Sequence, residues 1–403
     1  MHKVLLVISK FPPEYSGPGV RIPRLYEWFK QTQNTYDLSV ICNGIEQTRS
    51  EIYEHNGISV RRIVPQWAHK ILNAISCVPK KYKHSLLYQL EFLQTFFHFL
   101  FSRSYNNVDL LHVAGHSGGT AAALLWAKIK SKPVLMELVT ANAPYRQKFL
   151  FVFKTPELDN LKVVALTRDM QDKCLRAGLS SDQLWCRPNP INEEKFCLPV
   201  QQEKETLRSE ISSFTERHIV LASVAKMMPQ KNQFLIVKAL KHLPDEFVAL
   251  IAGPVIEEGP LYERDLAYVN EMKDFIKQHN LEDRVKITPD FVEAVTYMKA
   301  GDIYMMPAWN EGFGTPMIEA MACGLPVIGN QDEPAFREWI QNGENGFLCD
   351  IQKPEEWAVA IEKASAISKE QCAHFSKQTH QDAGQSSIYS AYEKIIKQLI
   401  NKK

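Results

Sequence analysis

The chain has 403 residues, which is enough for two domains rather than one. Its content of 45% hydrophobic and 23% charged residues is ordinary for a globular protein. The eight cysteines are scattered and form no CxxC pair, which argues against a zinc site or a disulfide framework and favours a reducing compartment.

Charge is distributed unevenly along the chain. Residues 1–190 contain 24 Lys and Arg against 14 Asp and Glu, whereas the remainder contains 23 against 32. The net charge of +1 therefore hides a basic and an acidic part, as expected if the two parts meet different partners. The basic part suits an acidic acceptor or an anionic membrane, and a solvated basic face is an equal alternative.

The N-terminus, MHKVLLVISKFPP, is too short and too soon interrupted by proline for a signal peptide, and it is typical of a first buried strand. Since no run of about 18 apolar residues is present, we expect no spanning helix. These features predict a cytoplasmic protein that either stays free or makes peripheral contact with the inner face of the membrane. Nothing in the sequence indicates a nucleic-acid partner.

An apolar run at 3–9 precedes a Gly/Pro-rich loop and the helical pattern RIPRLYEWFK. This order of strand, loop and helix is the first unit of a doubly wound α/β sheet. Because ligands bind at the carboxyl ends of such strands, the loop 12–19 is a candidate site. Gly17 and Gly19 would let the backbone approach a phosphate or a sugar, and a structural turn is the alternative.

Further strands are predicted at 37–42 and 58–64. From Gly57 to Leu90 there are six Lys and Arg and no Asp or Glu, interleaved with apolar residues. The next stretch, LLYQLEFLQTFFHFLF, is apolar with a helical period. The segment 57–103 would suit an anionic bilayer, and a pair of core-packing helices with a basic outer side is the slightly preferred alternative.

The segment 108–119 is predicted to be a strand that ends near two histidines and continues into an Ala-rich helix. Either His112 or His116 would face the site, where it could move a proton or orient an acceptor. A purely structural histidine is the alternative. Strands at 133–139 and 162–167 complete this parallel set, and a turn-rich segment at 187–196 leads out of it.

A polar stretch at 197–217 is interpreted as a linker with a short helix, and a second α/β series follows it. Its strands are expected at 218–226, 247–253, 284–288, 302–307 and 326–329. After about residue 380 a last helix closes the chain. The domains are therefore predicted at 1–190 and 191–380, followed by a C-terminal helix at 381–403.

The loop after the first strand of the second series reads VAKMMPQKN. It places Lys226 and Lys231 at the end of a strand, where two ammonium groups would neutralise a diphosphate as it becomes a leaving group. Solvated surface lysines are the alternative.

The stretch from Asn310 to Gly329 reads NEGFGTPMIEAMACGLPVIG. It predicts a short helix in which Thr315 is the N-cap, Pro316 occupies the first position and Gly324 supplies the left-handed end. Gly312 and Gly314 leave the backbone N–H groups of the preceding loop open to an anion. Glu311 and Glu319 would flank one bound molecule, although solvated glutamates on a capped helix are the alternative.

These segments together resemble glycosyltransferase family 4, whose members are retaining enzymes of the GT-B fold. EGFGTPMIEAMACGLPV is close to the signature wording of the family. FPPEYSGPG is similar to its N-terminal Gly loop, RPNPIN with Phe196 to its "NGVD…F" segment, and AKMMPQKN to its "GRL…K" phosphate loop. The match spans nearly the whole chain.

The resemblance implies an α/β protein with two Rossmann-like domains that face each other across a cleft, and with the C-terminal helix packing back on the N-terminal domain. It implies a donor nucleotide sugar held mainly by the C-terminal domain. By analogy, Lys226 and Lys231 contact the diphosphate and Glu319 contacts the ribose. Glu311 lies near the sugar.

The same analogy assigns other groups of the donor and acceptor sites. The donor set further includes Gly17 from the N-terminal domain and the loop residues Gly312, Phe313, Gly314 and Thr315. The acceptor set comprises His112, His116 and Gly19. His116 joins Glu311 and the two lysines as a catalytic candidate, and the choice between His112 and His116 stays open.

The resemblance also implies a mechanism in which the acceptor attacks from the face of the leaving group and a phosphate oxygen takes its proton. No metal and no other cofactor is expected. Lys226 stands where the family has an arginine, which keeps the charge and loses the bidentate geometry. The predicted function is the transfer of a hexose or related sugar from a nucleotide-diphosphate sugar to a glycan or lipid-linked acceptor, in polysaccharide or glycoconjugate biosynthesis.

Two other classes of function fit the same fold. One is a non-catalytic protein that binds a sugar nucleotide, and the other is a different GT-B chemistry such as epimerisation or phosphorolysis. Glycan hydrolysis by the two glutamates ranks low, because the lysine loop has no purpose in a hydrolase of a neutral glycan. The donor base, the sugar and the acceptor are left open by the sequence.

Overall fold

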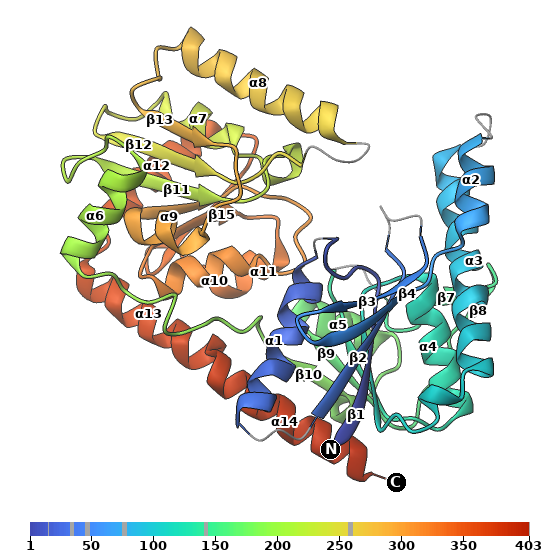
Figure 1. Ribbon diagram of the computed structural model, residues 1–403. Helices are drawn as coiled ribbons and strands as arrows, with labels where there is room; N and C mark the ends of the chain where they lie inside the picture. Colours follow the sequence, from blue (N-terminus) through green and yellow to red (C-terminus); the bar gives the residue numbers. More distant parts are fainter. Residues whose placement is uncertain are drawn as a thin grey trace. The chain divides into compact units, whose positions relative to one another are not determined.

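The computed structural model describes residues 1–14, 16–32, 36–44, 49–74, 79–140, 144–256 and 261–402. The chain divides into two compact units, which are treated separately below (Figure 1). The first unit comprises Met1–Arg187 with Tyr389–Lys403, and the second comprises Pro188–Ile388.

The first unit is built on an eight-stranded sheet in the order β10-β9-β6-β5-β1-β2-β4-β3. All neighbours in this sheet are parallel except β3, which pairs antiparallel with β4 at the edge. The strands are β1 (His2–Ile8), β2 (Tyr36–Cys42), β3 (Glu51–His55), β4 (Ile58–Arg62), β5 (Leu110–Ala114), β6 (Val134–Glu137), β9 (Leu161–Ala165) and β10 (Leu184–Cys186).

The helices of this unit and a small hairpin complete it. They are α1 (Gly17–Thr32), α2 (Gln66–Ala74), α3 (Lys80–Phe101), α4 (Gly118–Ile129), α5 (Arg168–Arg176) and the larger part of α14 (Gln385–Asn401), with single turns η1 (Arg103–Tyr105) and η2 (Ser181–Gln183). The hairpin pairs β7 (Lys148–Phe149) with β8 (Phe153–Lys154). Neither β3 nor the hairpin is predicted by the sequence, because both are short and mostly exposed.

The second unit is a six-stranded, wholly parallel sheet in the order β13-β12-β11-β14-β15-β16. Its strands are β11 (Ile219–Val224), β12 (Phe247–Ala252), β13 (Val285–Thr288), β14 (Ile303–Met306), β15 (Val327–Asn330) and β16 (Gly346–Cys349). Its helices are α6 (Gln201–Ile211), η3 (Pro229–Lys231), α7 (Phe234–Leu240), α8 (Tyr262–Gln278), α9 (Ala294–Ala300), α10 (Thr315–Ala322), α11 (Pro334–Trp339), α12 (Pro354–Ser365) and α13 (Lys369–Ala383).

Helices cover both faces of the parallel strands, so these strands are apolar on both sides. Every residue of β12 is buried, for example. In the second unit α7 and α12 pack on one face of the sheet, where Trp357 of α12 is fully buried in the same apolar cluster as Leu221 and Met305. Each unit therefore has a Rossmann-like architecture, and the predicted α/β class with two such domains is confirmed.

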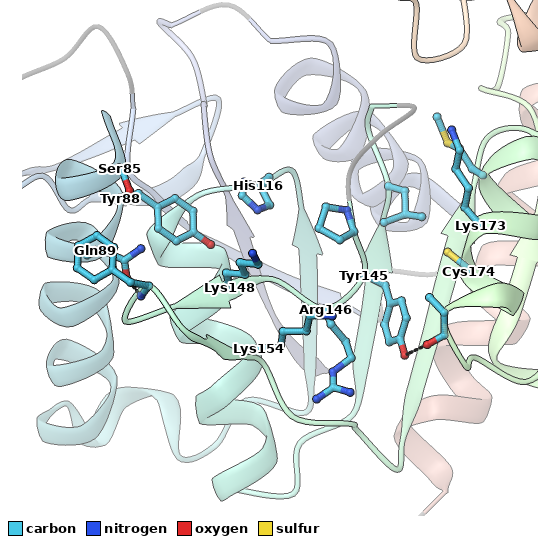
Figure 2. A pocket seen from close by; sticks show the side chains of 15 residues that line it. Ser85, Tyr88, Gln89, His116, Tyr145, Arg146, Lys148, Lys154, Lys173 and Cys174 are labelled. Atoms are coloured by element: carbon cyan, nitrogen blue, oxygen red, sulfur yellow. Dashed lines mark hydrogen bonds between the residues drawn. The ribbon is translucent and has the colours of Figure 1, made fainter. Parts of the chain in front are cut away.

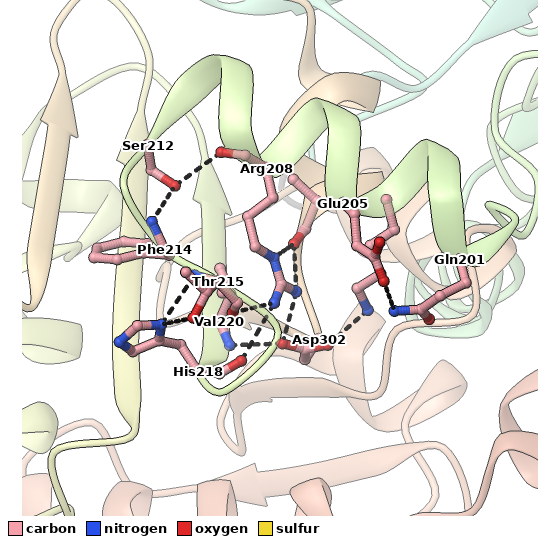
Figure 3. A network of polar contacts seen from close by, with 11 residues as sticks. Gln201, Glu205, Arg208, Ser212, Phe214, Thr215, His218, Val220 and Asp302 are labelled. Atoms are coloured by element: carbon pink, nitrogen blue, oxygen red, sulfur yellow. Dashed lines mark hydrogen bonds and ion pairs between the residues drawn. The ribbon is translucent and has the colours of Figure 1, made fainter.

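The segment predicted as a linker is instead anchored to the second unit by α6 (Figure 3). Arg208 is 5% exposed and donates to the Ala300 carbonyl at 2.8 and 3.0 Å and to Asp302 at 2.9 Å. Asp302 in turn accepts the Val220 N–H of β11 at 2.7 Å and pairs with Lys204 at 2.6 Å. A buried arginine with this many acceptors fixes the helix against the start of β11 and β14.

The last helix returns to the first unit, as the sequence predicts. Tyr389, Tyr392 and Ile396 of α14 are buried, and Tyr389 makes an edge contact with Trp28 of α1 at 5.7 Å between ring centroids. Asn160 donates to the Leu399 carbonyl at 2.9 Å and holds the end of the helix.

Candidate functional site

The candidate donor site of the second unit is formed by two loops, which follow the carboxyl ends of β11 and β14. The Trp309 N–H donates to the Gln230 carbonyl at 3.1 Å, and the Gln230 side chain donates to the Asn310 carbonyl at 3.1 Å. These bonds bring together the two segments that the sequence singles out. Both strands lie next to each other in the sheet, so the loops meet at one edge.

The two loops are joined by charge as well. Lys231, on the single turn η3, forms an ion pair with Glu311, and both side chains are mostly shielded from solvent. Lys226 lies 3.5 Å from Asp265 of α8, whose side chain is 1% exposed and also pairs with Arg264 at 2.6 Å. Each predicted lysine therefore has a carboxylate partner, and the Lys231 partner is itself a predicted site residue.

Glu333 fixes the backbone of the second loop, and sequence reasoning missed it. Glu333 is 7% exposed. Its carboxylate accepts hydrogen bonds from the N–H groups of Asn310 at 2.5 Å and Glu311 at 3.1 Å. Glu333 lies between the end of β15 and the start of α11. Like the two loops above, it follows the carboxyl end of a strand, and this position could have identified it as a site residue from the sequence. Asn310 has a left-handed backbone with φ of 57°, which this pair of bonds holds in place.

The short helix α10 begins differently from the prediction. Gly314 occupies the N-cap in a left-handed conformation with φ of 79°, and no side chain caps the helix. The prediction of Thr315 as the N-cap is therefore wrong, and Pro316 is the second helical residue rather than the first. The Thr315 hydroxyl accepts a hydrogen bond from Asn189 at 2.8 Å instead. The predicted left-handed end at Gly324 is confirmed by its φ of 78°.

The start of α10 is consequently a turn of backbone N–H groups without a capping side chain. Such a helix start carries partial positive charge and favours an anion. Gly314 also packs too closely for any side chain, since a Cβ there would lie 2.6 Å from Cε1 of Phe336. Phe313 turns its ring inward against Trp339, at 6.2 Å between centroids.

Glu311 and Glu319 both act electrostatically on the buried Tyr304. Tyr304 of β14 exchanges hydrogen bonds with the backbone of Val224 at 3.1 and 3.3 Å. Burial raises the pKa of Tyr304 first, and the charges of Glu319 and Glu311 raise it further. The charges of the two carboxylates therefore reach the same region near the ends of β11 and β14, and Gly312 is partly exposed.

In the first unit the predicted Gly loop ends earlier than expected. Gly17 is already the first residue of α1 and is exposed, with open space where a Cβ would be. Gly19 is buried in the first turn, where its N–H donates to Ser16 Oγ at 3.0 Å. A Cβ at Gly19 would lie 2.5 Å from that oxygen, so its packing alone requires glycine.

The structure separates the two histidines. His112 of β5 is fully buried, where Nδ1 lies 2.8 Å from the Tyr26 hydroxyl and Nε2 lies 3.2 Å from Glu137. His112 therefore has no exposed area, and each of its ring nitrogens has a buried partner. His116 lies two residues beyond the end of β5 and stacks on Tyr88 at 5.2 Å. Burial lowers the pKa of His116 and favours its neutral imidazole.

Glu137 of β6 is the centre of the network that holds His112. It is 1% exposed and pairs with Arg21 of α1 and, at 3.3 Å, with Arg187. Burial alone would raise the pKa of Glu137, but the two arginines and His112 outweigh it and hold that pKa well below its usual range. Tyr392 of α14 also donates to this carboxylate at 2.5 Å.

The basic segment 57–103 forms β4, α2 and α3. Phe92 and Phe99 of α3 are buried, and Phe99 stacks on Trp126 of α4 at 5.1 Å, as the core-packing alternative expects. Large apolar side chains of the same segment are nonetheless exposed, namely Trp67, Ile71, Tyr82, Leu86, Phe97, Leu100 and Phe101. The helices therefore pack on the core and also present an apolar outer side.

Among the described residues no group of three or more His, Cys, Asp or Glu is placed to hold a metal ion. Within the same ranges, no helix combines the length and the apolar character that crossing a membrane requires.

The family model "Glycosyl transferases group 1" matches residues 204–382. The D-inositol 3-phosphate glycosyltransferase of Xylanimonas cellulosilytica is 27% identical over 202 residues, which are 49% of this chain and 46% of that protein. The matched segment thus spans less than half of this curated relative.

Two solved structures share the fold over the whole chain. The sucrose-phosphate synthase of Thermosynechococcus elongatus has a TM-score of 0.73 at 16% identity, with 100% of both chains covered. The Anabaena HepE structure in complex with UDP and glucose has a TM-score of 0.69 at 16% identity, covering 99% of this chain and 100% of that one. The two Rossmann-like units therefore share the GT-B fold of these structures, and residues 204–382 are similar to the glycosyl transferases group 1 family.

Proposed function

We propose that this protein is a retaining glycosyltransferase that moves a hexose-type sugar from a nucleotide-diphosphate sugar to a glycan or lipid-linked acceptor. The observation that carries the proposal is the pairing of Lys231 with Glu311 beside the uncapped start of α10. Cation, carboxylate and helix start are the groups that a diphosphate sugar requires. They lie together in the unit that matches the family model.

The roles of the donor residues follow from charge. Lys226 and Lys231 would bind the diphosphate, and the start of α10 at Thr315 would add backbone N–H groups. Glu319 would hold the ribose hydroxyls and Glu311 the hydroxyls of the sugar. The solved complex of HepE with UDP and glucose supports a nucleotide-sugar donor for a protein of this fold.

In the proposed transfer reaction, positive charge develops at the anomeric carbon of the donor sugar. Its bond to the diphosphate oxygen breaks, which leaves an oxocarbenium-like sugar and a diphosphate anion. The ammonium group of Lys231 would stabilise that anion in exchange for its present partner Glu311. Glu311 would then be released from its ion pair with Lys231 and could accept a hydrogen bond from a hydroxyl group of the sugar. The acceptor attacks from the face of the leaving group, and a phosphate oxygen takes its proton.

A donor screen tests this proposal most directly. The full chain is incubated with UDP-, GDP- and ADP-sugars, with and without candidate acceptors, and both nucleoside diphosphate and free sugar are measured. We expect diphosphate release with one donor class, and we expect it to persist after EDTA treatment because the lysines carry the charge. Binding of donors without turnover under every acceptor would instead indicate a sugar-nucleotide-binding protein.

The exposed apolar side of α2 and α3 supports a peripheral membrane contact of the first unit. Trp67 and Ile71 are 61% and 51% exposed on a helix whose chain neighbourhood is basic. We therefore propose attachment to anionic bilayers. Vesicle co-sedimentation at low salt tests it, and a protein that stays in the supernatant with anionic vesicles would contradict it.

A further inference from the structure

A cavity of about 780 Å³ lies wholly within the first unit (Figure 2). Its walls come from α3, the segment after β5, the hairpin β7–β8 and α5. Four of the fifteen lining side chains are cationic, namely Arg146, Lys148, Lys154 and Lys173, and none is Asp or Glu. A hollow with this composition has a positive potential, which low-dielectric walls strengthen.

Two of these cations lack a counter-charge within the described part of the chain. Arg146 is paired with Glu157 at 3.1 Å, and Lys173 is paired with Asp169 at 2.7 Å. Lys148 and Lys154 are direct partners across the hairpin, and neither forms an ion pair with a described residue. Like charges directly opposite each other destabilise a strand pair. An anion bound between them would remove this repulsion.

One side chain in the wall of the cavity, Tyr88, also carries a buried polar atom. The Tyr88 hydroxyl is shielded from solvent and has no hydrogen-bond partner among the described residues. Tyr88 stacks on His116, and Figure 2 shows both bordering the same space as Lys148. A buried hydroxyl without a partner is costly, and a hydroxyl-bearing ligand would satisfy it.

The turn of the hairpin that lines the cavity has a conformational cost. Leu150 and Phe151 both have left-handed backbones, with φ of 46° and 63°, which bulky residues seldom adopt. Gln89 of α3 accepts the Phe151 N–H at 3.3 Å, and Phe149 stacks on Phe92 at 4.8 Å. Phe151 thereby lines the cavity, although its side chain is 59% exposed. Strain of this kind is typical of functional sites.

We propose that this cavity binds an anionic, hydroxyl-bearing ring, such as a sugar or polyol with a phosphate or carboxylate group. Lys148 and Lys154 would hold the anionic group. Tyr88, His116 and Phe151 would contact the ring and its hydroxyls. In naming this ligand as the acceptor substrate, the inference rests on the proposed glycosyltransferase function; as a binding site, it does not.

Binding measurements with no nucleotide sugar present test the binding site independently of the proposed glycosyltransferase function. Glucose 6-phosphate, glucuronate, inorganic phosphate and glucose are titrated into the full chain by calorimetry and ligand-observed NMR. We expect both anionic sugars to bind at least tenfold tighter than glucose, because glucose lacks the charge-assisted contacts. We also expect their affinity to fall as salt is raised. Equal affinity for glucose, or no binding of any anionic probe at millimolar concentration, would overturn the proposal.

A charge-matched pair of variants locates the site. Lys148→Ser/Lys154→Ser should weaken glucose 6-phosphate binding about tenfold, since the loss involves two partly solvated cations. Lys30→Ser/Lys130→Ser removes the same charge from exposed positions of this unit outside the cavity and should leave binding unchanged. If both double variants lost the same affinity for glucose 6-phosphate, the net charge of the protein would explain the loss and the proposed site would be refuted.

A third arm distinguishes a soluble ligand from a lipid surface. Vesicles of phosphatidylcholine with phosphatidylglycerol are sedimented with the wild type and with Lys148→Ser/Lys154→Ser. We expect equal sedimentation of both proteins. If the lysine variant loses vesicle binding while no soluble sugar probe binds, the hairpin is a membrane contact and the proposed sugar site is wrong. If anionic sugars bind but no donor is turned over, the site stands and the proposed function fails.

Discussion

At the scale of single residues, Lys231 has two roles that mutation can separate. In the structure it neutralises Glu311, and in the proposed reaction it neutralises the departing diphosphate. Lys231→Ala should lower kcat/KM by about 100-fold or more, which is typical for the loss of one stabilising group of a transition state. The far-UV circular dichroism should not change. Lys353→Ala, which removes an exposed lysine paired with Glu356, is the control and should keep full activity.

A double variant distinguishes catalysis from structure. Lys231→Ala leaves Glu311 as a partly buried carboxylate without its partner, which costs some stability. In Lys231→Ala/Glu311→Gln that charge is gone, so thermal stability should return toward the wild-type value. Transfer should remain lost. Recovery of transfer along with stability would show that Lys231 serves only to neutralise Glu311.

Glu137 carries a buried charge that two arginines of the first unit share. Glu137→Gln leaves Arg21 and Arg187 without their shared carboxylate, and Arg187 is buried deeply enough that its pKa falls to about 9. We expect a loss of about 3 kcal/mol in the free energy of unfolding, measured by chemical denaturation. Glu157→Gln breaks an exposed pair with Arg146 and should cost about 0.5 kcal/mol or less.

Between helices α3 and α4, Glu91 gives the protein a dependence on pH. Burial raises the pKa of Glu91 to about 7, the Gly118 N–H opposes this, and Glu14 adds to it. The folded protein therefore binds a proton that the unfolded chain releases at about pH 4.5. The contribution of Glu91 to stability is complete below pH 4.5 and is lost as the pH rises through 7.

Glu91→Gln should remove that loss. At pH 8 the variant should exceed the wild type by about 2 kcal/mol in the free energy of unfolding, and at pH 4 the two should agree. Denaturant titrations across this range measure it. Glu27→Gln, at an exposed position of α1, is the matched control and should leave the difference at zero. If the variant and the wild type had the same free energy of unfolding at every pH, Glu91 would be in contact with solvent and its pKa would not be raised.

At the scale of elements, the start of α10 depends on the shape of Gly314. Gly314→Ala combines a left-handed backbone, which costs about 1–2 kcal/mol for an L residue, with a Cβ 2.6 Å from Phe336. We expect the turn to move and the affinity for the donor to fall, as measured by calorimetry. Gly343→Ala has the same backbone strain at φ of 82° but open space around the Cβ. It should lose stability alone, and an equal loss of donor affinity would rule out a local effect.

The same elements show how far sequence reasoning reaches. Most strands of the two sheets were predictable because parallel strands are covered on both sides and form short apolar runs, as in β12. The short sheet-edge strands β3, β10 and β16 were not predicted. Glu311, Lys226 and Lys231 follow such strands, so their meeting at one sheet edge was predictable as well. The N-cap of α10 was not, because a left-handed Gly314 replaces the side-chain cap that Thr315 would provide.

Contacts between segments far apart in the sequence could not be predicted. Glu137 and Tyr392 are 255 positions apart, and only the return of α14 brings them together. The same network buries His112, whereas His116 lies at the cavity, and no sequence pattern distinguishes these two environments. The hairpin β7–β8 was missed because two residues on each side carry no periodic pattern.

At the scale of the whole molecule, the first unit is made from two separate parts of the chain. Its second part, Tyr389–Lys403, supplies buried side chains of α14 and the hydroxyl that bonds Glu137. The second unit is continuous in sequence. Removal of residues 389–403 should therefore unfold or loosen the first unit and spare the second, because the apolar surface that α14 covers is exposed to water.

Hydrogen exchange followed by mass spectrometry resolves the two units. In the truncated protein, amide protection should fall in β5 and β6 and stay at the wild-type level in β12 and β14. Lys394→Ala, at an exposed position of α14, is the control and should change neither. Tyr392→Phe should reproduce a weaker form of the effect, since only the hydrogen bond to Glu137 is lost. Equal loss of protection in both sheets would show that α14 stabilises the chain as one cooperative body.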